Sequence, residues 1–85
     1  MNAEERAWRS AREADALRAG KTAATSLQEA LARVGIVIPS LRAGYPVNGN
    51  AHVELGGCNA DTATKLAKII NGAADALPEL RATAP

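Results

Sequence analysis

The stretch that decides the fold is LRAGYPVNGNAHVEL, which occupies residues 41–55. Two short runs that alternate in character flank the dipeptide Asn48-Gly49, a pattern that predicts a β-hairpin. A two-residue turn at this dipeptide would put the apolar side chains of the two strands on opposite faces, because side chains alternate along a strand. A three-residue loop over residues 47–49, with Gly49 in the left-handed conformation, puts them on one face. We therefore expect the three-residue loop.

The register that follows from this loop also matches side chains across the two strands. On the apolar face it sets Ala43 opposite Val53 and Leu41 opposite Leu55. On the other face, Arg42 lies opposite Glu54 as an opposite-charge pair, which stabilises an antiparallel sheet. Both faces therefore favour the same register.

Residues 3–34 contain no proline and are predicted to form one long helix, or two helices hinged near Gly20. Small and apolar residues in the second half repeat at spacings of three and four, which places them on one face: Leu17, Gly20, Ala24, Leu27, Leu31 and Val34. The stripe stops near Leu17, so residues 1–16 could form a protruding helical arm. Gly35 directly follows the stripe and predicts the end of the helix.

A second helix is predicted from about residue 60 to about residue 77. Asn59 is suited to cap its N-terminus, and Pro78 is suited to stop it. Its apolar residues again repeat at three and four: Ala63, Leu66, Ile70, Ala73 and Leu77, with Ile69 alongside. Residues 79–85 are expected to be a frayed tail.

The order of these elements predicts a single α+β domain over residues 1–85, with a two-layer α-β-β-α arrangement. We expect both helices to cover the apolar face of the hairpin. The chain has no Phe, one Trp and one Tyr among 85 residues, so its core is thin. A two-stranded sheet is also marginal by itself, and its edges are open to pairing. A homodimer is therefore expected.

The composition gives a broad class. Ten basic and nine acidic residues leave a net charge of +1, too small to attract nucleic acid or an anionic membrane over a distance. One cysteine cannot form an internal disulfide and suits a reducing compartment. Residues 1–6 are not followed by an apolar run, so we expect neither a signal peptide nor a membrane span. Together with an Ala-rich composition typical of high-GC genomes, these features predict a cytoplasmic bacterial protein.

A candidate reactive site precedes the second helix, where Gly57 and Cys58 follow the hairpin strand that carries His52. Free backbone N–H groups at a helix start stabilise a thiolate or bind an anion, so these three residues form a candidate thiol or anion site. The register turns His52 towards solvent, however, so we favour an exposed histidine and a buried structural cysteine. One Cys and one His are too few for a typical metal site, and we predict no metal, cofactor or catalytic residue.

Basic residues recur along the first predicted helix: Arg6, Arg9, Arg12, Arg18 and Lys21. Such rows contact phosphates, so Arg6, Arg9 and Arg12 could bind DNA. Acidic residues are interleaved with them and neutralise much of the charge: Glu4, Glu5, Glu13 and Asp15. We favour a solvated face with ion pairs such as Arg12 with Asp15. A protein-binding surface and a nucleic-acid site remain the alternatives.

The chain has two aromatic residues, one in the first predicted helix and one in the hairpin. Trp8 precedes the first stripe, and Tyr45 lies beside Pro46 near the hairpin tip. Because a large aromatic side chain needs a surface to bury against, Trp8 either caps the core of its own domain or anchors a second molecule. For the ring of Tyr45 we favour the core. The predicted partner-binding residues are Trp8, Arg9, Arg12 and Tyr45.

The sequence has no glycine-rich nucleotide-binding motif, no paired catalytic carboxylates and no serine triad. It therefore predicts a non-enzymatic interaction module, a homodimeric regulatory or accessory protein that offers its first helix and its hairpin to another protein. The alternative is a DNA-binding transcriptional regulator that contacts phosphates through its arginine row. The least favoured hypothesis is a thiol enzyme or anion binder at Cys58.

Overall fold

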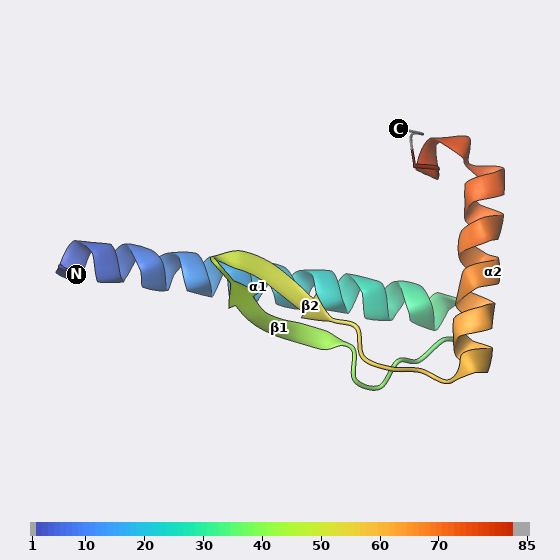
Figure 1. The fold of residues 1–85 in the computed structure, drawn as a ribbon, viewed down its shortest axis with the longest axis horizontal. Coiled ribbons are helices and arrows are strands. Elements are labelled where there is room, and N and C mark those ends of the chain that lie inside the picture. The colour runs from blue at the N-terminus through green and yellow to red at the C-terminus, as the bar shows by residue number, and fades with distance from the viewer. Residues whose placement is uncertain (1, 83–85) are drawn as a thin grey trace.

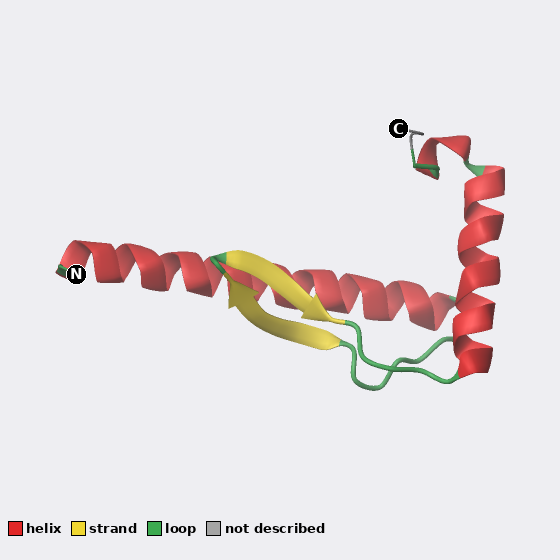
Figure 2. Ribbon diagram, in the orientation of Figure 1, coloured by secondary structure: helices red, strands yellow, loops and turns green. Residues whose placement is uncertain are grey.

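The computed structural model describes residues 2–82 and confirms the predicted α-β-β-α order (Figures 1 and 2). The elements are α1 (Ala3–Arg33), β1 (Arg42–Val47), β2 (Asn50–Glu54), α2 (Ala60–Ala76) and a short 3-10 helix, η1 (Pro78–Leu80). The expected frayed tail over 79–85 overlaps η1, and its last three residues lie outside the described part of the chain.

α1 is one continuous helix that passes through Gly20 without a hinge. At its N-terminus, the Asn2 side chain accepts a hydrogen bond from the Glu5 backbone N–H at 2.8 Å, which satisfies one otherwise free donor. At its C-terminus, Arg33 lies in the last turn and Gly35 takes a positive φ of 73°. Gly35 therefore ends the helix as predicted, because a left-handed residue there costs glycine no steric strain.

The hairpin has the predicted register, but its turn differs from the prediction. Ala43 pairs with Val53, whereas Val47 pairs with Asn50 across a two-residue turn. In that turn Asn48 and Gly49 both have positive φ, the geometry that suits the twist of a hairpin. The three-residue loop is therefore wrong.

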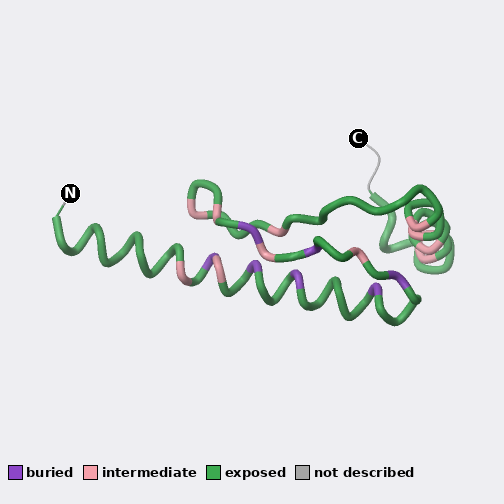
Figure 3. The backbone as a smooth tube through the Cα atoms, turned by 90° about the horizontal axis from the view of Figure 1, so that it is seen from below, coloured by how far each residue is buried: buried purple, intermediate pink, exposed green. Residues whose placement is uncertain are grey.

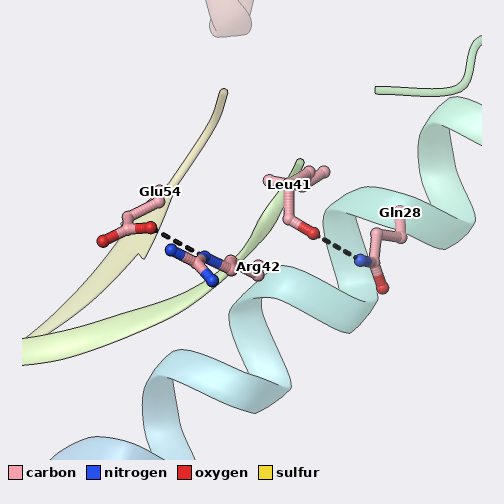
Figure 4. A network of polar contacts seen from close by, with 4 residues as sticks. All are labelled: Gln28, Leu41, Arg42 and Glu54. Atoms are coloured by element: carbon pink, nitrogen blue, oxygen red, sulfur yellow. Dashed lines mark hydrogen bonds and ion pairs between the residues drawn. The ribbon is translucent and has the colours of Figure 1, made fainter. Parts of the chain in front are cut away.

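An irregularity between Gly44 and Val47 restores the register that the turn alone would have shifted. Pro46 lies inside this irregular segment and has no N–H to offer to a ladder, so pairing there is interrupted at little cost. The predicted Arg42 to Glu54 pair forms, with Arg42 Nε donating to Glu54 Oε2 at 2.8 Å (Figure 4). Leu55, by contrast, lies beyond the end of β2 and is exposed, so its predicted pairing with Leu41 is wrong.

α1 packs against the hairpin through small residues. Ala16, Gly20 and Ala24 are the buried positions where the helix runs along the strands (Figure 3). A Cβ added to Gly20 would lie 2.8 Å from the carbonyl oxygen of His52 and 3.6 Å from Cβ of Ala43. The backbones of α1 and β2 therefore approach closely at Gly20, and a larger residue there would force the neighbouring backbone to shift.

A small core lies at the C-terminal end of α1. Leu31, Ile36 and Leu41 are buried, and four half-buried residues pack against them: Ile38, Val53, Leu66 and Ile69. Gln28 reaches across from α1, and its Nε2 donates to the carbonyl oxygen of Leu41 at 2.8 Å (Figure 4). This bond ties the chain to α1 just before β1 begins.

α2 does not cover the hairpin, contrary to the prediction. Its N-terminus is capped as predicted, because Asn59 Oδ1 accepts from the Thr62 N–H at 2.8 Å. The helix then runs away from the α1–hairpin unit at the C-terminal end of α1, and none of its residues is buried (Figure 1). The physical reason is width: two strands about 4.8 Å apart are covered by one helix of about 10 Å diameter, so α1 alone fills the apolar face.

The molecule is elongated. Its radius of gyration is 17.0 Å, whereas a compact chain of this length has about 12 Å. Its accessible surface is 6663 Å², about 1,900 Å² more than the roughly 4,800 Å² expected for a folded monomer of its mass. The single chain thus leaves far more surface in water than a closed domain does.

Candidate functional site

A groove of about 450 Å³ lies between the first half of α1 and the tip of the hairpin. α1 contributes Trp8, Arg9, Arg12 and Glu13, and the hairpin contributes its two turn residues, Asn48 and Gly49. The groove exists because α1 continues in the N-terminal direction past the hairpin tip (Figure 1). Three of the four residues predicted to bind a partner therefore meet in one place, and we call this site the arm groove.

The side chains of Trp8 and Arg12 are stacked in the arm groove. The guanidinium carbon of Arg12 lies 5.0 Å from the centroid of the Trp8 ring, which is cation–π geometry. Trp8 is still 61% exposed, so the interpretation that it caps the core is wrong. The predicted pair of Arg12 with Asp15 is also wrong, because Asp15 forms its ion pair with Arg18.

Arg12 also contacts the hairpin turn. A Cβ added to Gly49 would lie 3.0 Å from Arg12 Nη2, so the guanidinium rests against the turn backbone. Arg12 thus contacts both the indole of Trp8 and the hairpin turn, so its side chain spans the two walls of the groove. The sequence offered no signal for this contact, because it depends on how far the hairpin reaches along α1.

Tyr45 does not line the arm groove. It is 85% exposed, so the interpretation of its ring as core is wrong. It lines instead a smaller groove of about 270 Å³ on the hairpin, together with residues that include Lys21, Arg42 and Glu54. The structure therefore separates Tyr45 from the other predicted partner-binding residues.

The candidate site at Cys58 is open to solvent. Cys58 is exposed, so the prediction of a buried structural cysteine is wrong, whereas the predicted exposure of His52 is confirmed. Gly57 has no atom within 4 Å of where a Cβ would lie, so no close contact requires glycine at this position. The carboxylate of Glu54 is bonded to Arg42. Among residues 2–82, no three His, Cys, Asp or Glu side chains are grouped so that they could hold a metal ion.

A further apolar surface lies on α2, where sequence reasoning expected core. Ile70 is 58% exposed and Leu77 is 46% exposed, although both belong to the predicted apolar stripe. Leu66 and Ile69 do reach the small core, so the stripe is divided between the core and solvent. The amphipathic pattern was the signal for this surface, but it could not say which part would be covered.

Comparisons with models of protein families, with curated proteins and with solved structures found no match to this chain. In the part of the chain that the structure describes, neither helix has an apolar stretch long enough to cross a bilayer.

Proposed function

We propose that this chain is a non-enzymatic interaction module that acts as a homodimer in the bacterial cytoplasm, as a regulatory or accessory protein. Its N-terminal arm and hairpin tip are the surface for another protein. The observation that carries the proposal is the accessible surface of 6663 Å², which exceeds that of a compact chain of this mass by about 1,900 Å².

The amount of surplus surface supports self-association. A specific interface of standard size covers about 800 Å² on each partner, and obligate dimers cover about 1,000 to 2,500 Å² per subunit. The surplus falls within the obligate range. Part of it lies on the arm, where residues 2–13 are all exposed, but that arm is mostly charged or small. Exposed large apolar side chains lie on the hairpin and the loops beside it, and also on and beside α2, where they are Ile70, Leu77 and Leu80.

The arm groove supports binding of a partner protein. Trp and Arg are the residues most often found at the energetic centres of protein interfaces, and here Trp8 presents an exposed ring with Arg9 and Arg12 beside it. The groove is assembled within one chain from two elements that Arg12 bridges, so no partner is needed to bring its walls together. A preformed site costs less conformational entropy on binding.

The same contacts favour protein over DNA as the partner. Glu13 lines the groove and would repel a phosphate. The guanidinium of Arg12 covers one face of the Trp8 ring, which removes that face from base stacking. A row of arginines binds DNA best when no carboxylate lies beside it and when its aromatic neighbour is free to stack on a base.

The homodimer is tested by the solution mass of the untagged chain across a wide concentration range. The expected result is a species of twice 8.8 kDa that dissociates on dilution. A mass of one chain at every concentration would contradict it.

The partner surface is tested by placing a photo-crosslinking amino acid at Glu13 in the native host, which lines the arm groove and leaves Trp8 in place, with the same amino acid at Lys68 of α2 as the control. We expect a discrete protein adduct from position 13 only. Equal adduct patterns at both positions would contradict the proposal. Salt-sensitive binding of duplex DNA, weakened by Arg9→Ala with Arg12→Ala, would instead favour the transcriptional regulator.

A further inference from the structure

α2 has two adjoining apolar edges, and only one of them is used within the chain. Leu66 and Ile69 face the small core. The second edge consists of four residues of α2 and the residue that caps its C-terminus, at spacings of four and three: Ala63, Ala67, Ile70, Ala74 and Leu77. This spacing places them in one row along the helix, as at the contact positions of a coiled coil. We call this row the α2 seam.

The α2 seam is open in the single chain. Four of its residues are exposed, and the fifth, Ala74, is half-buried. The Ala74 carbonyl accepts a hydrogen bond from Arg81 Nε at 2.9 Å, which holds the chain that follows α2 against its last turns. The view in Figure 1 shows α2 standing clear of α1 and the hairpin along most of its length. The row is therefore open to a second helix from Ala63 to Ile70, and the chain around Arg81 borders it at Ala74.

The order of residues in the α2 seam is self-complementary. It is centred on Ile70, with Ala63 seven residues before and Leu77 seven residues after. If two such helices run antiparallel about a twofold axis at Ile70, each small Ala63 lies opposite the large Leu77 of the other copy. Ala67 and Ala74 bring the two backbones close together between these pairs. A twofold interface requires a self-complementary surface, because the same patch of each subunit contacts its copy in the other subunit.

We propose that two copies of this chain associate by pairing their α2 seams antiparallel about a twofold axis at Ile70. This proposal rests on the homodimer proposed above and names the surface that forms it. A helix of 17 residues is about 25 Å long, so the pairing runs along the whole of α2. The whole chain exposes a surplus of about 1,900 Å², part of it on the arm, against about 800 Å² that a standard interface covers on one partner.

The pairing leaves the other surfaces of the molecule free. The arm groove lies at the opposite end of α1 from α2, so a dimer formed at α2 presents two such grooves far from its axis (Figure 1). This geometry makes the module bivalent, which raises the apparent affinity for a partner that is itself repeated.

The decisive experiment compares Ile70→Glu with Gly72→Glu by sedimentation equilibrium. Both variants add one negative charge to α2, but position 72 is about 200° around the helix from position 70 and has open space around it. Ile70→Glu brings two charges together at the dimer axis, so we expect the dimer dissociation constant to rise about 100-fold or more. Gly72→Glu should leave that constant within about threefold of the wild-type value, because position 72 lies on the side of α2 that faces away from the second copy.

Each outcome has a distinct meaning. If the wild type is a monomer at every concentration, both the homodimer and the α2 seam are contradicted. If the wild type is a dimer and Ile70→Glu dimerises equally well, the homodimer stands and the seam is overturned. Circular dichroism checks that Ile70→Glu keeps its helicity, as expected for an exposed residue. Should it lose helicity, Leu77→Glu at the end of the seam tests the same surface.

The orientation is tested by disulfide cross-linking in a Cys58→Ser background, which removes the exposed native thiol. We expect rapid cross-linking between a chain carrying Ala63→Cys and a chain carrying Leu77→Cys, and little between two Ala63→Cys chains. The reverse result would show a parallel pair. Cross-linking in neither mixture, with the dimer intact, would overturn the seam.

Discussion

α1 and α2 behave in opposite ways. α1 has the weaker separation of apolar and polar faces, yet it packs along the whole hairpin, whereas α2 has the sharper apolar face and buries no residue. Besides the narrow width of the sheet, the size of the contact residues contributes to this difference. α1 offers Gly20 between two alanines, so backbone can meet backbone, while α2 offers isoleucine and leucine at its surface. An amphipathic pattern therefore indicates that a helix packs against another element or another chain. Small residues on the helix indicate where that packing brings the two backbones close together.

The largest expected difference in unfolding free energy is between a substitution in the core of the α1–hairpin unit and one on the surface of α2. Leu31→Ala removes a buried side chain beside Ile36 and Leu41 and should lower the free energy of unfolding by about 2 to 5 kcal/mol. Ile70→Ala should change the stability of the dilute monomer by less than about 0.5 kcal/mol. Urea unfolding at low chain concentration measures both. Equal losses in the two variants would mean that Ile70 is part of the monomer core.

Two glycines inside helices should respond to alanine with opposite signs. At Gly20 the added methyl meets the His52 carbonyl oxygen, and the cost of overpacking should exceed the gain in helix propensity, for a net loss of about 1 to 2 kcal/mol. At Gly72 there is open space, so the same change should stabilise by about 0.5 to 1 kcal/mol. Thermal unfolding of both variants decides the matter, and a stabilising Gly20→Ala would contradict the close approach.

The start of α2 depends on a local cap, whereas α1 is held mainly by the hairpin. Asn59→Ala removes the acceptor for the Thr62 N–H and should cost about 1 kcal/mol. Backbone chemical shifts should report fraying confined to the first turn of α2. Asn59→Asp, which keeps an acceptor, serves as the control and should retain the helical shifts. Unchanged shifts in Asn59→Ala would show that the cap is dispensable.

The smallest effect is expected on the outer face of the hairpin. Arg42→Ala breaks an exposed pair with Glu54, for a loss of about 0.2 to 1 kcal/mol that shrinks as salt is added. A double-mutant cycle with Glu54→Ala isolates the pair energy. A coupling well above 1 kcal/mol would mean that the pair also holds the hairpin register.

The sequence allowed the elements to be predicted because their signals are local. Asn59 caps α2 whatever lies around it, and the opposite charges of Arg42 and Glu54 favour the register whichever turn the hairpin uses. The turn itself was mispredicted because the irregularity beside Pro46 could not be seen in the alternation of residues. The two-residue turn and the irregularity each shift the pairing, and together they produce the register that was expected from a three-residue loop.

The placement of side chains on the surface could not be predicted, because it depends on how elements are oriented. The stacking of Arg12 on Trp8 requires the hairpin to end at a certain turn of α1. Tyr45 and Cys58 are exposed, and α2, which was expected over the hairpin, points away from it. Of the candidate site, Trp8 and its neighbouring arginines were found from the sequence, and the hairpin side of the groove was not.

Amide hydrogen exchange at two chain concentrations tests the central claim, that α2 is completed by a second copy while the α1–hairpin unit is complete in one chain. We expect the amides of α2 to lose protection on dilution below the dimer dissociation constant, while those of α1 around Gly20 to Leu31 keep theirs. Protection of α2 that does not depend on concentration would contradict the account.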